Sequence, residues 1–146
     1  MFRGNHPATV DDKGRLKLPR AFLDPLIARH GRKLFVTSLD GESVSIYPLP
    51  IWEEIENRLA PRGDLDPAKR KFLLRVNYFG QETEIAAYGR VLIPLRLRTQ
   101  TGTAGPVDVL GKGRCLEAWD HEKLQQRIEN DPPSEAEHAL LAGLGV

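Results

Sequence analysis

The chain has 146 residues, 40% of them hydrophobic and 28% charged, a composition typical of one compact domain or of two half-domains that share one interior. No apolar run approaches the roughly 18–20 residues that a membrane span needs, and the first residues lack the apolar region of a signal peptide, so we expect a cytoplasmic protein. The single cysteine, Cys115, excludes an internal disulfide and fits a reducing compartment.

The net charge of +1 conceals a segregation of charge along the chain. Residues 1–34 carry eight Lys and Arg against three Asp and Glu, whereas residues 34–67 carry two against seven. A cluster at Lys69–Arg75 adds four positive charges, and residues 107–146 hold four basic and eight acidic residues. Basic segments of this kind create a local positive potential that a polyanion can feel, although alternating solvated faces without any role would show the same pattern.

The first 30 residues predict two short strands around a turn, followed by a helix. In residues 15–18 leucines alternate with basic residues, the pattern of a half-buried strand with a basic outer face. The turn occupies 11–14, and Gly14 stands where a hairpin loop commonly needs positive φ. Pro19 ends the ladder, and residues 20–29 predict a short helix that presents its apolar side chains inward.

A second pair of strands is predicted at 34–37 and 43–47, joined across Asp40-Gly41, a strong hairpin signal. Pro48 then opens an amphipathic helix that carries Trp52 on its apolar stripe. A stripe of this kind is more often core than a ligand platform, and we interpret it as core.

The second half repeats this plan after a linker at 61–66 and a helix from Pro67 to about Phe79. The elements expected there are a strand at 82–85, a turn at 88–89, a strand at 90–93, strands at 107–110 and 115–119 joined through 111–113, a helix capped by Asp120, and a tail helix with a capping box at Ser134 and Glu137. The tail helix is either a docking element or frayed.

The most informative feature is a duplication. Gly14–Pro19 (Gly-Arg-Leu-Lys-Leu-Pro) recurs 75 positions later as Gly89–Pro94 (Gly-Arg-Val-Leu-Ile-Pro). Each copy is followed by a basic, leucine-rich stretch, a β-rich segment ending in an aromatic residue (Tyr47, Trp119) and an amphipathic helical pattern. A unit this small rarely buries its apolar face alone, so we expect the two copies to share one core and each to present the same turn, with its arginine, to a partner.

Several motifs together resemble the MraZ family of bacterial transcriptional regulators: Met1–Gly4, Asp11–Pro19, Tyr47–Glu53 and Gly89–Pro94. The resemblance covers nearly the whole chain. It implies a mainly β fold with flanking helices, of the α+β class, in which two tandem SpoVT-AbrB units interleave their hairpins in a pseudo-twofold, swapped β-barrel. The corresponding division of the chain is 5–52 for the first repeat, 53–80 for a helical linker, 81–124 for the second repeat and 125–146 for a C-terminal helix and tail.

The resemblance also implies the partners. MraZ-like proteins are expected to form homo-oligomeric rings that bind direct repeats in double-stranded promoter DNA, associate with the nucleoid, and typically repress the cell-division and cell-wall gene cluster that contains their own gene. No cofactor, metal ion, membrane or small-molecule substrate is expected.

The family's DNA-binding signature, Asp-x-x-x-Arg, falls on Asp11 and Arg15 in the first copy. The planar fork of an arginine can bind a guanine edge or a phosphate through two hydrogen bonds, and an aspartate across the turn can hold that fork or cap the turn's amides. Turn chemistry alone favours a plain hairpin with an outward arginine, but the duplication and the resemblance reverse that preference. The residues expected to bind DNA are Asp11, Lys13, Gly14, Arg15, Lys17, Arg20 and Arg3 in the first copy, and Gly89 and Arg90 in the second.

The second copy departs from the signature because Ala86 stands where the first copy has Asp11. Arg90 therefore lacks its expected carboxylate partner. Glu84 would face the same side of a strand as residue 86, which makes it a candidate substitute. We accordingly rank Arg15 well above Arg90 as a DNA contact.

Catalysis finds little support in the sequence. The four histidines are scattered and show no metal-ligand spacing with Cys115, which is expected to be a small buried side chain rather than a nucleophile. Gly111-Lys112-Gly113 departs from the spacing of a phosphate-binding loop and is expected to be a turn. The chief alternative is an antitoxin-like AbrB module that binds protein partners and has only non-specific affinity for DNA; a duplicated enzyme scaffold comes third.

Overall fold

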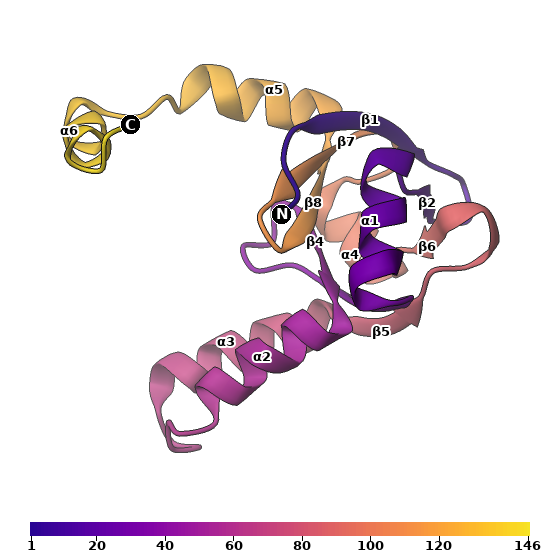
Figure 1. Ribbon diagram of the computed structural model, residues 1–146, viewed down its shortest axis with the longest axis horizontal. Helices are drawn as coiled ribbons and strands as arrows, with labels where there is room; N and C mark the ends of the chain where they lie inside the picture. The colour runs from indigo at the N-terminus through magenta and orange to yellow at the C-terminus, as the bar shows by residue number, and fades with distance from the viewer.

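Eight strands form one antiparallel sheet that curls into a nearly closed barrel, with six helices around it (Figure 1). The structure is a computed structural model and describes residues 1–146. The elements are β1 (Asn5–Val10), β2 (Arg15–Lys17), α1 (Arg20–His30), β3 (Lys33–Thr37), β4 (Val44–Pro48), α2 (Leu49–Leu59), α3 (Pro67–Phe79), β5 (Gln81–Glu84), the 3-10 turn η1 (Ala87–Gly89), β6 (Arg90–Leu92), α4 (Leu95–Thr101), β7 (Gly105–Lys112), β8 (Cys115–Asp120), α5 (His121–Asn130) and α6 (Glu135–Gly143).

The strand order is β5-β3-β4-β8-β7-β1-β2-β6, so the two outer strands, β5 and β6, are consecutive in the chain. They approach each other at the turn that joins them, where the amide of Ala86 donates to the carbonyl of Arg90 at 2.8 Å. A sheet whose outer strands meet has almost no free edge, which removes the template that an open edge offers for aggregation.

The halves interleave as the resemblance implies. Strand β1 of the first half pairs with β7 of the second, and β5 of the second half pairs with β3 of the first. The register shows the pseudo-twofold axis directly: in the β2–β6 ladder Leu16 lies opposite Val91, its own counterpart 75 residues later. The expected swapped barrel is therefore confirmed.

Both halves contribute to one main core of 18 buried residues. In β2 and β6 only the middle residue, Leu16 or Val91, is buried, whereas β4 is buried along its whole length. Leu16, Val91, Ile93 and Leu97 are among the core residues with no exposed surface. A smaller cluster lies under α2, where the Trp52 ring stacks on Phe35 with centroids 4.6 Å apart. The interpretation of the Trp52 stripe as core is confirmed, and Cys115 is buried in the same cluster.

Five of the six helices, all but α4 (Leu95–Thr101), begin where the sequence predicted. Asp66 accepts hydrogen bonds from two amides of the first turn of α3, which covers Pro67–Phe79, and Asp120 caps α5 by accepting one from the amide of Lys123. Ser134 and Glu137 form the expected capping box of α6. None of the helices combines the length and the apolar character that crossing a membrane requires.

Helices α2 and α3 form a long antiparallel hairpin that projects from one side of the barrel (Figure 1). On the other side α5 leads away from the barrel, and α6 stands clear of it at the end of the chain. No residue of α6 is buried.

Candidate nucleic-acid interface

The two glycine–arginine turns share one end of the barrel because β2 pairs directly with β6. Each turn is also tied to the strand of the other half. The amide of Leu18 donates to the carbonyl of Gly89 at 2.9 Å, and the amide of Ile93 donates to the carbonyl of Gly14 at 2.8 Å. The exchange is reciprocal, so any partner that meets one turn finds the other beside it. We call residues 11–17 and 86–90 the turn face.

In the first turn a single carboxylate organises both the main chain and the arginine. Asp11 Oδ1 accepts hydrogen bonds from the amides of Lys13 (3.0 Å) and Arg15 (2.9 Å), and Oδ2 accepts one from Arg15 Nε (3.1 Å). The bond from the Arg15 amide, more than any other contact, holds the pKa of Asp11 below its usual value. The carboxyl group is consequently ionised at neutral pH, where it can keep the arginine in place.

The arrangement leaves the outer end of the Arg15 fork free. Only Nε is bound to Asp11, and the two terminal nitrogens make no hydrogen bond or ion pair within the chain. The side chain retains 39% of its accessible surface. A guanidinium held by one edge, with its other donors open to solvent, is prepared to bind a planar acceptor pair such as a guanine edge or a phosphate.

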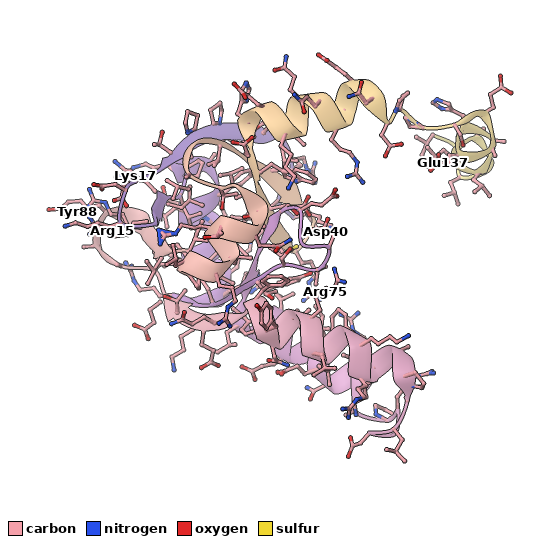
Figure 2. The ribbon with its side chains drawn as sticks, turned by 180° about the vertical axis from the view of Figure 1, so that it is seen from behind. Arg15, Lys17, Asp40, Arg75, Tyr88 and Glu137 are labelled. Atoms are coloured by element: carbon pink, nitrogen blue, oxygen red, sulfur yellow. The ribbon has the colours of Figure 1, made fainter.

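The β2–β6 ladder gives the turn face its positive charge. Leu16 and Val91 are fully buried, so the residues that flank them in sequence point outward. Lys17 lies directly opposite Arg90, which brings one basic side chain from each half together on the outer surface. Figure 2 shows Arg15 and Lys17 close together at one edge of the molecule.

The second turn supports its arginine in another way. Tyr88 adopts a left-handed conformation (φ 63°, ψ 20°), with 79% of its surface exposed, and the Arg90 guanidinium lies over its ring, 5.8 Å from the centroid. The suggestion that Glu84 replaces the missing aspartate is wrong: Glu84 is exposed, forms no ion pair with Arg90, and lies opposite Lys33 in the β3–β5 ladder. A ring face is a weaker and less directional anchor than a carboxylate.

The remaining predicted basic residues fall into two groups. Lys13 is exposed within the first turn, and Arg20, exposed at the start of α1 and 3.9 Å from Asp24, lines a cavity with Lys17 and Tyr88, so both adjoin the turn face. Arg3 does not. It precedes β1, next to the backbone of Gly111, at the opposite end of that strand from the turn. Six residues of strand span roughly 20 Å, which separates Arg3 from the turn face.

Backbone geometry requires the glycines of both turns, and each packs closely against a side chain of a helix. Gly14 and Gly89 have φ of +84° and +72°, values that other residues rarely adopt. A Cβ at Gly14 would overlap the Arg98 guanidinium of α4, and a Cβ at Gly89 would overlap Leu23 of α1. Leu23 and Arg98 occupy equivalent positions in the two halves. A cationic side chain therefore packs against the glycine of the first turn, and an apolar one against the glycine of the second.

A cavity of about 300 Å³ extends the turn face between α1 and the second turn. Its polar lining comprises Lys17, Arg20, Arg32, Tyr88 and one acidic residue, Asp24. Arg32 was not among the predicted residues; it donates from Nη1 to the carbonyl of Ile85 at 3.3 Å. Nothing in its local sequence marks it, because the barrel closure alone brings it beside the second turn.

Comparisons with known proteins agree on one family. Residues 1–75 match the family model described as "MraZ protein, putative antitoxin-like". The chain is 46% identical to the transcriptional regulator MraZ of Acidobacterium capsulatum and 39% identical to that of Koribacter versatilis, over the full length of both chains in each case. It is 34% identical to the transcriptional regulator MraZ of Nitrosospira multiformis, over 89% of this chain and 88% of the relative.

Proposed function

Because this chain belongs to the MraZ family of transcriptional regulators, we propose that it regulates transcription by binding double-stranded DNA with the turn face, with Arg15 at the centre of the contact. The observation that carries the proposal is the state of Arg15. Its Nε is fixed on Asp11 at 3.1 Å, while its terminal nitrogens have no partner within the chain and the side chain is 39% exposed. A lone surface arginine would have to be ordered on binding, at an entropic cost that this one has largely avoided.

The shape of the turn face suits a duplex. The major groove of B-DNA accepts antiparallel β structure, and the outer face of the β2–β6 ladder, although part of the barrel, presents basic side chains from both halves beside the two turns. In this position Arg15 reads a base edge, while Lys13, Lys17 and Arg20 contact phosphates, which positions the protein without specifying sequence. Arg90 rests only on Tyr88 and makes a looser contact, and Arg3 lies outside this interface.

Each turn face offers few contacts, so we propose that several copies act together. A ring of subunits binds direct repeats upstream of the protein's own gene, in a cluster of cell-division and cell-wall genes, and represses that cluster in the nucleoid. Linked weak sites gain affinity through effective concentration, provided that the spacing of the repeats matches the spacing of the subunits. No cofactor and no catalytic step enters this proposal.

A second candidate function is an antitoxin-like module whose turn face meets an acidic protein surface. The description of the matching family model, which includes the words antitoxin-like, favours it. The same guanidinium fork that binds a phosphate also binds a carboxylate, so the two candidates must be separated by measurement.

The test is a salt series with two duplexes: the DNA upstream of the protein's own gene and a scrambled duplex of equal length. For a DNA-binding regulator, log affinity falls linearly with log salt, with a slope of about −0.9 for each phosphate contact, and the upstream fragment binds at least about 1,000-fold more tightly than the scrambled one. Weak binding that is equal for both duplexes would support the protein-binding module instead.

A further inference from the structure

Helix α3 carries an exposed stripe on the side that faces α4 and the loop at Asp40 and Gly41. Lys71, Leu74, Arg75 and Tyr78 follow the i, i+3, i+4, i+7 spacing that places side chains on one face of a helix. Leu74 and Tyr78 are 61% and 58% exposed, unusually high values for large apolar side chains that adjoin each other. The stripe is therefore an apolar strip flanked by cations.

The stripe forms one wall of a groove whose other wall includes α4. A hollow of about 640 Å³ lies between Lys71, Leu74, Arg75 and Gln100, and it continues past Tyr78 into a second one of about 560 Å³ at Leu95 and Arg96. The Arg96 guanidinium lies over the Tyr78 ring, 4.6 Å from its centroid. We call this the α3–α4 groove.

The charge of the groove is positive, and the groove is separate from the turn face. Its cations are Lys71, Arg75 and Arg96; the one acidic residue that lines it, Asp40, already accepts hydrogen bonds from the amides of Glu42 and Ser43. Figure 2 places Arg75 and Asp40 away from the edge that carries Arg15. A duplex held on the turn face leaves the groove open.

Helix α6 has the complementary character. Glu137, Leu140, Leu141 and Leu144 repeat the i, i+3, i+4, i+7 spacing, and Leu140 and Leu144 are 73% and 79% exposed. Residues 130–146 contain three acidic residues and neither Lys nor Arg. The capping box fixes the start of the helix, so α6 is a formed helix with an apolar stripe that begins at an acidic residue. None of its residues is buried, and it stands clear of the barrel (Figure 1).

We propose that α6 of one copy binds in the α3–α4 groove of a neighbouring copy. Its leucines cover Leu74, Tyr78 and Leu95, and its acidic end meets the cations of the groove. The partner is another copy because Pro132-Pro133 forms a short, stiff connection that holds α6 away from its own barrel (Figure 1).

A contact of this kind is head-to-tail: each copy offers a helix on one side and a groove on the other. Repetition of a head-to-tail contact closes into a ring when the rotation permits. The inference thus rests on the proposed assembly of several copies and names the two surfaces that build it, while DNA recognition by Arg15 does not depend on it.

The test uses two full-length double variants, Leu140→Asp/Leu144→Asp in the tail and Leu74→Asp/Tyr78→Asp in the groove. All four positions are exposed, so the fold should survive, and circular dichroism verifies this. Glu137 is left unchanged because it is part of the capping box. The control is Leu65→Asp, which lies outside both surfaces and is 90% exposed.

Native mass decides the outcome. We expect wild type and Leu65→Asp to assemble, each double variant alone to run as a single chain, and an equimolar mixture of the two to give pairs and nothing larger, because only one intact helix meets one intact groove. If the variants keep the wild-type mass, or if their mixture stays monomeric, this inference fails and the assembly proposal stands. A wild-type protein that is monomeric at all concentrations would overturn both.

Discussion

At the first turn, the position of Arg15 depends on one neighbouring carboxylate. Asp11 accepts hydrogen bonds from two amides of the turn and from the arginine's Nε, so it sets the backbone and the side chain together. Because its pKa in the folded chain is lowered, its contribution to stability is present above the ordinary pKa of an aspartate, about 3.9, and is lost only as the pH falls through the lowered value. The turn is therefore insensitive to pH near neutrality.

Asp11→Ala should weaken DNA binding even though it removes a negative charge from the interface. Without the carboxylate the Arg15 fork is no longer held, and we expect roughly tenfold lower affinity for the upstream fragment, measured by fluorescence anisotropy. Asp12→Ala is the matched control, because Asp12 is the adjacent aspartate, is exposed and makes no hydrogen bond through its side chain. Equal effects of the two changes would show that Asp11 acts by charge alone.

Gly14 combines a left-handed backbone conformation with close packing against Arg98. Gly14→Ala would place a methyl group in the left-handed region and against the Arg98 guanidinium. We expect a loss of at least about 1 kcal/mol in the free energy of unfolding, measured by urea denaturation. Gly63→Ala, where a Cβ meets nothing and φ is not left-handed, should change stability by less than about half of that. A neutral Gly14→Ala would contradict the described turn geometry.

At the scale of elements, side chains alternate between the two faces of the β2–β6 ladder. The residues that stabilise the core and the residues proposed to bind DNA therefore lie on opposite faces. Leu16 and Val91 belong to the core, whereas their sequence neighbours Lys17 and Arg90 belong to the outer surface. This division was visible in the sequence as alternating leucines and basic residues. Helix α4 was not, because Leu95 to Arg98 alternates in the same way and yet forms a helix in which Leu97 is fully buried.

Substitutions at two neighbouring positions should therefore differ in effect: one should reduce stability and the other should reduce DNA binding. Leu16→Ala removes a fully buried side chain from the centre of the barrel and should cost about 2–5 kcal/mol of stability. Lys17→Ala should leave the urea midpoint nearly unchanged and should reduce both DNA affinity and the salt slope, by about one phosphate contact. If Lys17→Ala leaves the slope unaltered, the turn face does not contact phosphate at this position.

On the scale of the whole molecule, duplication explains the barrel and also limits what could be predicted. Two copies of one unit, too small to bury their apolar faces separately, predicted a shared core, and the pairing of Leu16 with Val91 confirms the pseudo-twofold axis. The support of Arg90 by Tyr88 could not be predicted, because it depends on a left-handed tyrosine that local sequence rules disfavour. Arg32 and Arg98 reach the turns only through tertiary packing.

The barrel is symmetric in its backbone and asymmetric in its chemistry. The first turn joins Arg15 to a carboxylate and has Arg98 behind its glycine; the second has a tyrosine ring and Leu23 in the corresponding places. One scaffold thus presents a cation fixed by a carboxylate beside one that contacts only a ring. Specific recognition is expected to depend mainly on the fixed one.

The most direct measurement compares Arg15→Ala with Arg90→Ala for binding to the upstream fragment and to its scrambled counterpart, with native mass measured in parallel. Arg15→Ala should abolish the preference for the upstream fragment and leave the mass of the assembly unchanged, and Arg90→Ala should produce a smaller loss. Wild-type affinity and preference in Arg15→Ala would contradict the assignment of the turn face as the DNA-binding surface.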